Sequence, residues 1–138
     1  MLDETMQQSL TWHAAMENTY GPLRVQDKTP IQVWACGSCS NPGTPMAAAG
    51  GGVYWGPLNP ANSSVRVSGD KQDAGRGSLL AILRALDSAD PRRALTIFTD
   101  SEYAIRSIAE WAPARFELGW SCPDGDLLRD IQLLIRRR

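Results

Sequence analysis

The acidic side chain best placed for chemistry is Asp100, because it ends a short apolar run. Leu95, Ile97 and Phe98 in that run are strand formers, and a helical pattern follows at once. A carboxylate at the C-terminal end of a buried strand lies where α/β proteins place their reactive groups. Ser101 can cap the helix that follows. The sequence therefore predicts a functional site around Asp100.

The three cysteines offer a second kind of chemistry. Cys36 and Cys39 form a CxxC pair, and Cys122 lies far along the chain. A structural zinc site needs four ligands, so His13 or Asp100 would have to complete this set. A redox role is disfavoured, because redox CxxC pairs precede a helix whereas a proline–glycine loop follows this one. The odd number of cysteines also argues against a disulfide scaffold and favours a reducing compartment.

The composition is that of an ordinary globular chain rather than a strongly basic nucleic-acid binder. The length of 138 residues predicts one domain, and the net charge is −1. No apolar run reaches the ~20 residues that span a bilayer, and the acidic N-terminus has no secretory pattern. The basic end 136–138 suits a solvated helix terminus. We therefore expect an intracellular protein, cytoplasmic or nuclear, with no membrane span.

Periodicity predicts an α/β fold of order βββαβαα behind an N-terminal helix. Three strands with short turns predict an antiparallel meander, and the strand–helix–strand unit after it predicts a parallel pair. We expect two parts, an N-terminal helix with a linker (1–30) and the main domain (31–138). The expected helices are 1–20, 73–87, 101–112 and 124–137; the strands are 31–35, 52–56, 64–68 and 95–100; residues 36–43, 47–52 and 114–123 are expected to be loop, flexible or irregular.

From Ile31 onward the chain resembles the type 1 ribonuclease H family. Within that family its segments look most similar to the domains of fungal retroelements. The resemblance rests on the order and spacing of several segments, namely 36–43, 51–56, 79–86, 99–103, 119–120 and 125–128. It implies an RNase H-like mixed sheet, three antiparallel strands and then a parallel one. It also implies truncation, since the family's final strand, loop and helix have no counterpart before Arg138.

The resemblance implies a metal-dependent nuclease for RNA–DNA hybrids whose acidic cluster is depleted. Two divalent ions about 4 Å apart would be held by several carboxylates. Of the family's four acids only Asp100 is retained, because Cys36 and Ser78 stand at two of the positions and the fourth lies in the missing section. A thiolate is a poor Mg²⁺ ligand. We therefore expect Mg²⁺ or Mn²⁺ to bind weakly and cleavage to be lost or severely impaired.

Other acids do not replace the lost ones on this alignment. Three aspartates belong to a helix away from the cleft, and we expect capping and surface roles for them: Asp124, Asp126 and Asp130. Two tryptophans, Trp111 and Trp120, resemble aromatics of the family's substrate-side protrusion, although local packing explains them equally well.

The resemblance also implies nucleic-acid contacts, partly eroded here. The implied contact residues are Gly37, Ser38, Asn41, Arg76 and Ser101. Ala74 and Gly75 replace amide donors at the helix start. Three readings stay open: an impaired domain that still binds RNA–DNA hybrid or other nucleic acid, an active hybrid ribonuclease with other ligands, and a structural or interaction module. Self-association, or a partner chain, is also expected at the incomplete sheet unless residues 1–20 cover it.

Overall fold

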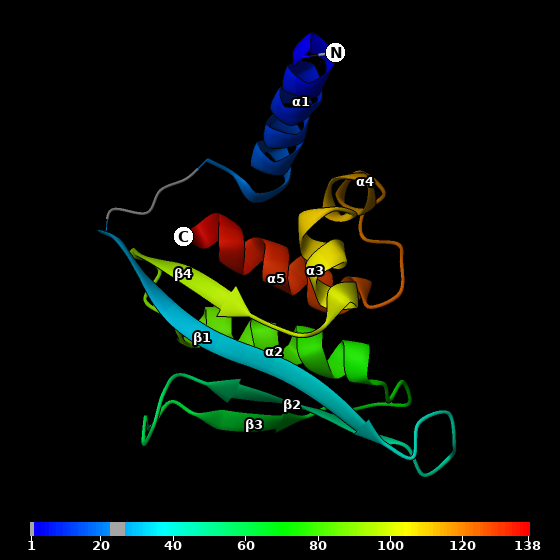
Figure 1. Cartoon of the computed structure of the whole chain (residues 1–138). Coiled ribbons are helices and arrows are strands. Elements are labelled where there is room, and N and C mark those ends of the chain that lie inside the picture. The colour runs from blue at the N-terminus through cyan, green and yellow to red at the C-terminus, as the bar shows by residue number, and fades with distance from the viewer. Residues whose placement is uncertain (1, 23–26) are drawn as a thin grey trace.

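The computed structural model describes residues 2–22 and 27–138, with side chains described for 11–22 and 29–138 (Figure 1). Its elements in chain order are α1 (Leu2–Tyr20), β1 (Asp27–Ser40), β2 (Ala48–Tyr54), β3 (Ser63–Arg66), α2 (Ala74–Ser88), β4 (Arg93–Phe98), α3 (Glu102–Ala109), α4 (Ala112–Glu117) and α5 (Gly125–Arg137).

The four strands form one mixed sheet in the order β3-β2-β1-β4. The β1–β2 and β2–β3 pairs are antiparallel, whereas β1 and β4 run parallel. This arrangement confirms the expected α/β, RNase H-like sheet. The parallel pair is possible because α2 provides the long crossover that parallel strands require.

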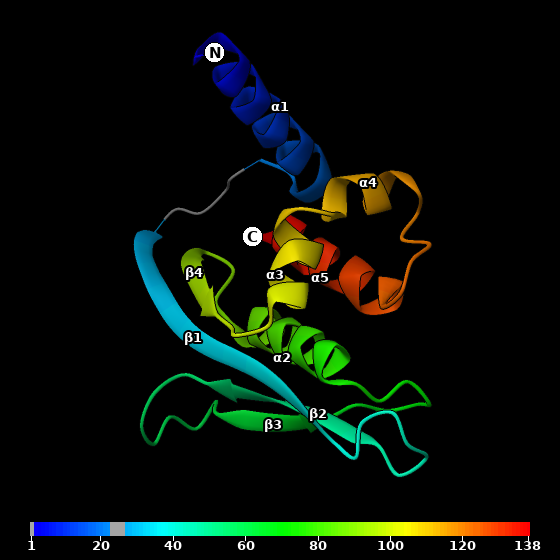
Figure 2. The same ribbon diagram turned by 45° about the vertical axis from the view of Figure 1, so that its right-hand side comes forward.

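The core lies between the sheet and α2, which crosses behind β1 in both ribbon views (Figures 1 and 2). The side chains that fill it are buried apolar residues of β1, β2, α2 and α5, namely Val33, Ala35, Val53, Leu79, Ile82, Leu128 and Ile131. Alternation along β1 sends Val33 and Ala35 inward and leaves Trp34 and Cys36 exposed on the other face. The inner face is therefore packed, while the outer face presents side chains to solvent.

Strand β1 is longer than the sequence indicated, and this corrects two expectations. The expected loop 36–43 is strand as far as Ser40, and the expected flexible segment 47–52 lies mostly within β2. The small residues there pair directly, with Cys36 opposite Gly52 and Cys39 opposite Ala49. Glycine weakens a strand on propensity alone, but the sheet neighbours override that preference here.

A short helix, α4, occupies part of the segment expected to be irregular (114–123), so the order is βββαβααα. Helix α3 ends at Ala109, and Pro113 does not end a helix but stands in the first turn of α4. Proline has no backbone N–H, and the first turn of a helix leaves that donor unused, so it is tolerated there.

Helix α1 is tied to the domain by side-chain bonds to backbone carbonyls. Trp12 Nε1 donates to Ala109 O at 3.2 Å, and the Tyr20 hydroxyl donates to Ile108 O at 2.6 Å. From α5, Gln132 Nε2 donates to Thr19 O at 2.9 Å. The far end of α1 projects away from the domain (Figure 2). Helix α1 is thus bonded to the end of α3 and to α5, and its backbone also lies close to α4. Among the described helices, none is long and apolar enough to cross a membrane.

Candidate functional site

Asp100 and Cys36 lie close together just beyond the end of the parallel ladder between β1 and β4. Trp34 pairs with Phe98 in the parallel β1–β4 ladder, so Cys36 and Asp100, each two residues further on, lie at the same level. Both are exposed. They line a single pocket of about 480 Å³, whose remaining lining is mostly apolar: Trp34, Ile97, Phe98, Thr99 and Ile105. The end of the parallel ladder therefore places a thiol and a carboxylate at one apolar pocket.

Ser78 lies near this end of β1 but faces the interior. Its side chain is buried, and its hydroxyl donates to Ala74 O at 3.1 Å. Helix α2 approaches β1 closely at this point, since a Cβ added to Gly37 would lie 2.3 Å from the Ser78 backbone N. The fold therefore brings Ser78 against the residue that follows Cys36, but Ser78 is absent from the lining of the Cys36–Asp100 pocket.

This donor set does not fit the two divalent ions that the resemblance implies. Mg²⁺ prefers several hard oxygen ligands. Here Asp100 supplies one carboxylate, Cys36 supplies soft sulfur, and the Ser78 hydroxyl is engaged with the helix backbone. Among the side chains that the structure describes (residues 11–22 and 29–138), no group of three or more His, Cys, Asp and Glu is arranged to hold a metal.

The cysteines do not form the zinc site that was considered. Cys36 and Cys39 are three residues apart on one strand, so they point to opposite faces. Cys39 Sγ contacts Gln72 O at 3.5 Å, whereas Cys36 lines the outer pocket. The ring of His13 lies against Trp12 on α1. All three cysteines are free thiols.

A buried acid cluster centred on Asp124 corrects the expectation of a capping or surface role. Asp124 occupies the N-cap position of α5 but makes no capping bond with its side chain, which is only 1% exposed. Instead it accepts bonds from Lys71 Nζ and Arg76 Nη1, both at 3.0 Å, and from the Tyr103 hydroxyl. Asp126 binds the other arm of the Arg76 guanidinium at 2.7 Å.

These bonds shift the pKa of several groups. Burial alone would raise the pKa of Asp124, but its bonds from Tyr103, Lys71 and Arg76 outweigh burial and hold it below its ordinary value. The bond from Arg76 lowers the pKa of Asp126 to about 2. Burial, with the bond to Asp124, raises the pKa of Tyr103. The two carboxylates, Asp124 and Asp126, are therefore ionised at neutral pH. Their bonds join the start of α2 to the start of α5.

The predicted nucleic-acid contacts lie on four segments: β1, the turn after it, α2 and the N-cap of α3. Gly37 packs against α2, whereas Ser38 is exposed on β1. Asn41 forms the turn after β1, where its carbonyl accepts a bond from the Thr44 hydroxyl. Arg76 is held by its two aspartates, and Ser101 caps α3 by accepting a bond from Ala104 N at 3.2 Å.

The two tryptophans differ in exposure. Trp120 is buried against Phe116, so local packing accounts for it. Trp111 is half-buried, with the Arg115 guanidinium 4.7 Å from its ring centre.

Sequence reasoning missed the Asp124 cluster. Its members come from four separate segments, and none of the local patterns links them. The only signal was the presence of two acids at the start of one helix and one arginine at the start of another.

Known proteins resemble the chain over the region that forms this site. The sequence profile of the family described as RNase H matches residues 28–131. Ribonuclease H1 of Rattus norvegicus is 34% identical over 97 residues, covering 69% of this chain and 34% of the rat protein. Ribonuclease H of Schizosaccharomyces pombe is 34% identical over 104 residues, covering 75% of this chain and 39% of the yeast protein.

A bacterial relative matches over a larger share of its own length. Ribonuclease H of Nitrosospira multiformis is 32% identical over 117 residues, which is 78% of this chain and 70% of that protein. The chain thus spans little more than a third of the rat and yeast relatives. The extent of the match, together with the mixed sheet and the position of Asp100, establishes that this chain belongs to the ribonuclease H family, type 1.

Proposed function

We propose that this chain is an RNase H domain that binds RNA–DNA hybrid but cleaves it poorly or not at all. The observation that carries the proposal is that Cys36 lines the same pocket as Asp100, just beyond the end of the parallel ladder, where a second carboxylate would have to stand. One carboxylate supplies too few oxygen ligands and too little negative charge to hold two divalent ions, and the developing charge of phosphodiester cleavage needs both ions.

The Asp124 cluster argues against an active enzyme that recruits other ligands. Asp124 and Asp126 carry the carboxylates that could substitute for the missing metal ligands. These carboxylates already form ion pairs with Arg76 and Lys71. Freeing them for a metal would leave a buried guanidinium unpaired, which is costly. We therefore rank hybrid binding with impaired cleavage above an active nuclease with substitute ligands.

Hybrid binding is supported by family membership and by polar groups near the site. Ser38 is exposed on the same face of β1 as Cys36. Phosphate contacts of this kind make affinity fall steeply with salt. The free cysteines suit a reducing, intracellular compartment.

The decisive test is cleavage of a labelled RNA–DNA hybrid in Mg²⁺ and in Mn²⁺, with Asp100→Asn as the matched control. We expect no cleavage above the Asp100→Asn level. The double variant Cys36→Asp with Ser78→Glu should gain cleavage, most readily in Mn²⁺. Cleavage by the unaltered chain that disappears in Asp100→Asn would overturn the proposal that cleavage is impaired.

Binding is measured separately, by fluorescence anisotropy of the blunt hybrid in EDTA across a salt series. We expect affinity that falls linearly with log salt. A hybrid that does not bind even at low salt would instead favour the structural module.

Self-association is a second proposal, carried by residues 94–98 of β4, whose outer edge pairs with no strand among the residues that the structure describes. This strand ends the sheet, and its residues 94–98 include no charge and no proline. Such an edge is a template for pairing with another chain. Sedimentation velocity over a concentration series should reveal a dimer that Thr96→Lys weakens, because Thr96 is the exposed residue in the middle of this edge; a monomer at all concentrations would refute this proposal.

A further inference from the structure

A groove runs between α2 and α5, which lie side by side and point in the same direction in both ribbon views (Figures 1 and 2). Its volume is about 570 Å³, and leucines from both helices form its floor: Leu80, Leu83, Leu133 and Leu134. Leu133 is 55% exposed. Adjoining apolar side chains that reach the surface inside a polar rim mark a contact surface. The groove is therefore a candidate docking site.

The rim of this groove carries charges of both signs. Helix α2 contributes Arg84 and Asp87, and α5 contributes Asp130 and Arg137. The side chains of Arg84, Asp87 and Arg137 form no ion pair among the described residues. The Asp130 carboxylate has only a loose, exposed pair with Arg129 at 3.8 Å. These charges are therefore available to a partner that enters the groove.

The groove residues of α5 form one stripe with an acid at one end and a base at the other. Asp130, Leu133, Leu134 and Arg137 are spaced i, i+3, i+4 and i+7, which places them on one side of the helix. A second α5 laid antiparallel, with its midpoint between the two leucines, would set each Asp130 opposite the Arg137 of the other copy. Leucine would then face leucine. The stripe is thus complementary to itself, as a two-fold interface requires.

From this self-complementary stripe we propose that the groove between α2 and α5 binds a second copy of this chain, with the two α5 helices antiparallel along it. The proposal goes beyond hybrid binding and does not rest on it. It is also separate from β4 pairing, since no residue of β4 lines the groove. A helix of 13 residues is only about 20 Å long, so the contact is small and the dimer should be weak and concentration-dependent.

The charges select the antiparallel arrangement. A parallel copy would set Asp130 beside Asp130 and Arg137 beside Arg137, and like charges across an interface repel. In the antiparallel arrangement, the incoming Asp130 reaches the end of the groove where Arg137 and Asp87 lie, because the starts of α2 and α5 are joined and the helices run together. Arg84 stands on the same rim, so two bases there outweigh one acid.

The test is sedimentation velocity over a concentration series, run in the Thr96→Lys background so that pairing through β4 does not contribute. We expect a weak dimer. Asp130→Arg and Arg137→Asp should each weaken it about tenfold or more, because each sets like charges opposite one another. An equimolar mixture of these two variants should restore the dimer, since opposite charges then face each other at both ends of the mixed pair.

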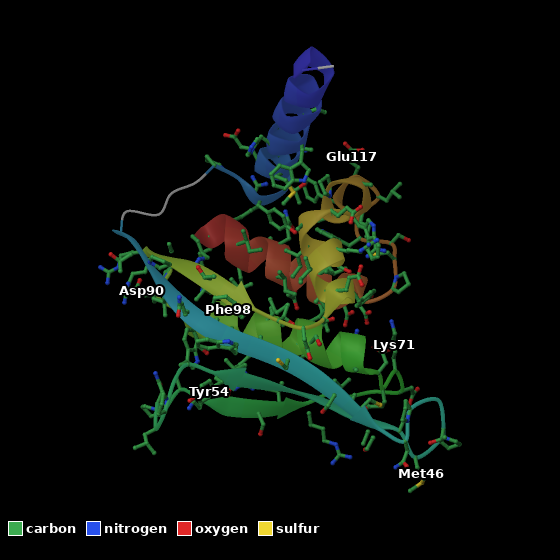
Figure 3. All side chains as sticks on the ribbon, in the orientation of Figure 1. Met46, Tyr54, Lys71, Asp90, Phe98 and Glu117 are labelled. Atoms are coloured by element: carbon green, nitrogen blue, oxygen red, sulfur yellow. The ribbon has the colours of Figure 1, made fainter. Side chains whose placement is uncertain are left out.

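The control for charge reversal is Glu117→Arg, because Glu117 is an exposed acid on α4 and lies outside the groove (Figure 3). It should leave the dimer unchanged. Leu133→Ser should abolish the dimer, whereas Leu58→Ser, at a fully exposed leucine elsewhere, should not. A monomer at all concentrations, a dimer that neither reversal weakens, or a mixture that stays monomeric would overturn the proposal. None of these results bears on hybrid binding, which is measured by anisotropy.

Discussion

Arg76 and Asp124 stand 48 residues apart in the sequence and form an ion pair of 3.0 Å across the starts of α2 and α5. The carboxylate is almost wholly buried, and Lys71 and Tyr103 bind it as well. A buried charge is tolerated only when it is fully paired, so these four side chains must assemble together. The pair therefore fixes the helix that carries Ser78 relative to α5.

Replacing Asp124 should destabilise the fold. Asp124→Asn keeps a residue type that tolerates the left-handed backbone at this position, where φ is 59°, but removes the charge. We expect a loss of about 2–3 kcal/mol in the free energy of unfolding, because Arg76 and Lys71 lose their buried partner. Urea denaturation measures this. The matched control Asp130→Asn removes an exposed charge and should cost less than about 0.5 kcal/mol.

The same cluster predicts a stability that depends on acid pH. The pKa values of Asp124 and Asp126 are both depressed in the folded chain, to about 2 for Asp126. The ionised forms therefore stabilise the fold above the unfolded pKa of about 3.9, and that stabilisation is lost as pH falls through the folded pKa values. The urea concentration at the unfolding midpoint should therefore decrease as the pH is lowered from about 5 to about 2. Asp124→Asn should flatten this dependence, and an unchanged slope would argue against the cluster.

Gly77 should tolerate no side chain, because α2 touches β2 through it. An added Cβ would lie 2.2 Å from Gly50 O, and a backbone oxygen in a sheet cannot move aside. We expect Gly77→Ala to cost about 2 kcal/mol even though alanine favours helix. Gly52→Ala is the control, since its Cβ enters open space. Thermal unfolding compares the two variants, and equal midpoints would contradict this packing.

Divalent metal should have little effect on stability. A ligand stabilises a fold in proportion to the logarithm of its concentration over its dissociation constant. With one carboxylate at the Cys36–Asp100 pocket, we expect 10 mM Mg²⁺ to raise the unfolding midpoint by less than about 1 °C relative to EDTA. The Cys36→Asp, Ser78→Glu variant should show a clearly larger shift. A large shift in the unaltered chain, absent from Asp100→Asn, would indicate a metal site.

The docking of α1 should depend on its hydroxyl contact with α3. Tyr20→Phe removes the donor to Ile108 O but keeps the ring that packs on the core. We expect a loss of about 1 kcal/mol and faster proteolysis near residues 18–22. Met46→Ala, on the exposed turn after β1, provides a control for expression and handling. Unchanged protection of α1 would mean that Trp12 and Gln132 hold the helix without Tyr20.

The sequence predicted the fold where patterns were local. Periodicity located α2 and α5, because their buried faces repeat at helical spacing and helix length exposes that repeat. The segment around Asp100 was found because a strand and a cap follow each other directly. The resemblance then implied a mixed sheet of three antiparallel strands and one parallel strand, which the structure confirms, whereas the pairing of β4 with β1 is known only from the structure.

Secondary-structure prediction from local sequence failed where contacts with neighbouring strands and helices outweighed the intrinsic propensity of the residues. The glycine-rich part of β2 and the far half of β1 look like loop, but sheet pairing and the close approach of α2 require small residues there. From the sequence, Pro113 was expected to end a helix, but it stands in the first turn of α4. Proline interrupts a helix only in its interior, because the first turn does not use the backbone N–H that proline lacks.

The sequence by itself determined which functional groups are present at the candidate site: a carboxylate at Asp100, a thiol at Cys36 and a hydroxyl at Ser78. Only the tertiary structure decided that the thiol and the carboxylate share a pocket while the hydroxyl faces inward. It also decided that Asp124 is buried and paired, and that leucines of α2 and α5 line one groove. Each of these depends on contacts between segments far apart in the chain, and no local pattern encodes such contacts.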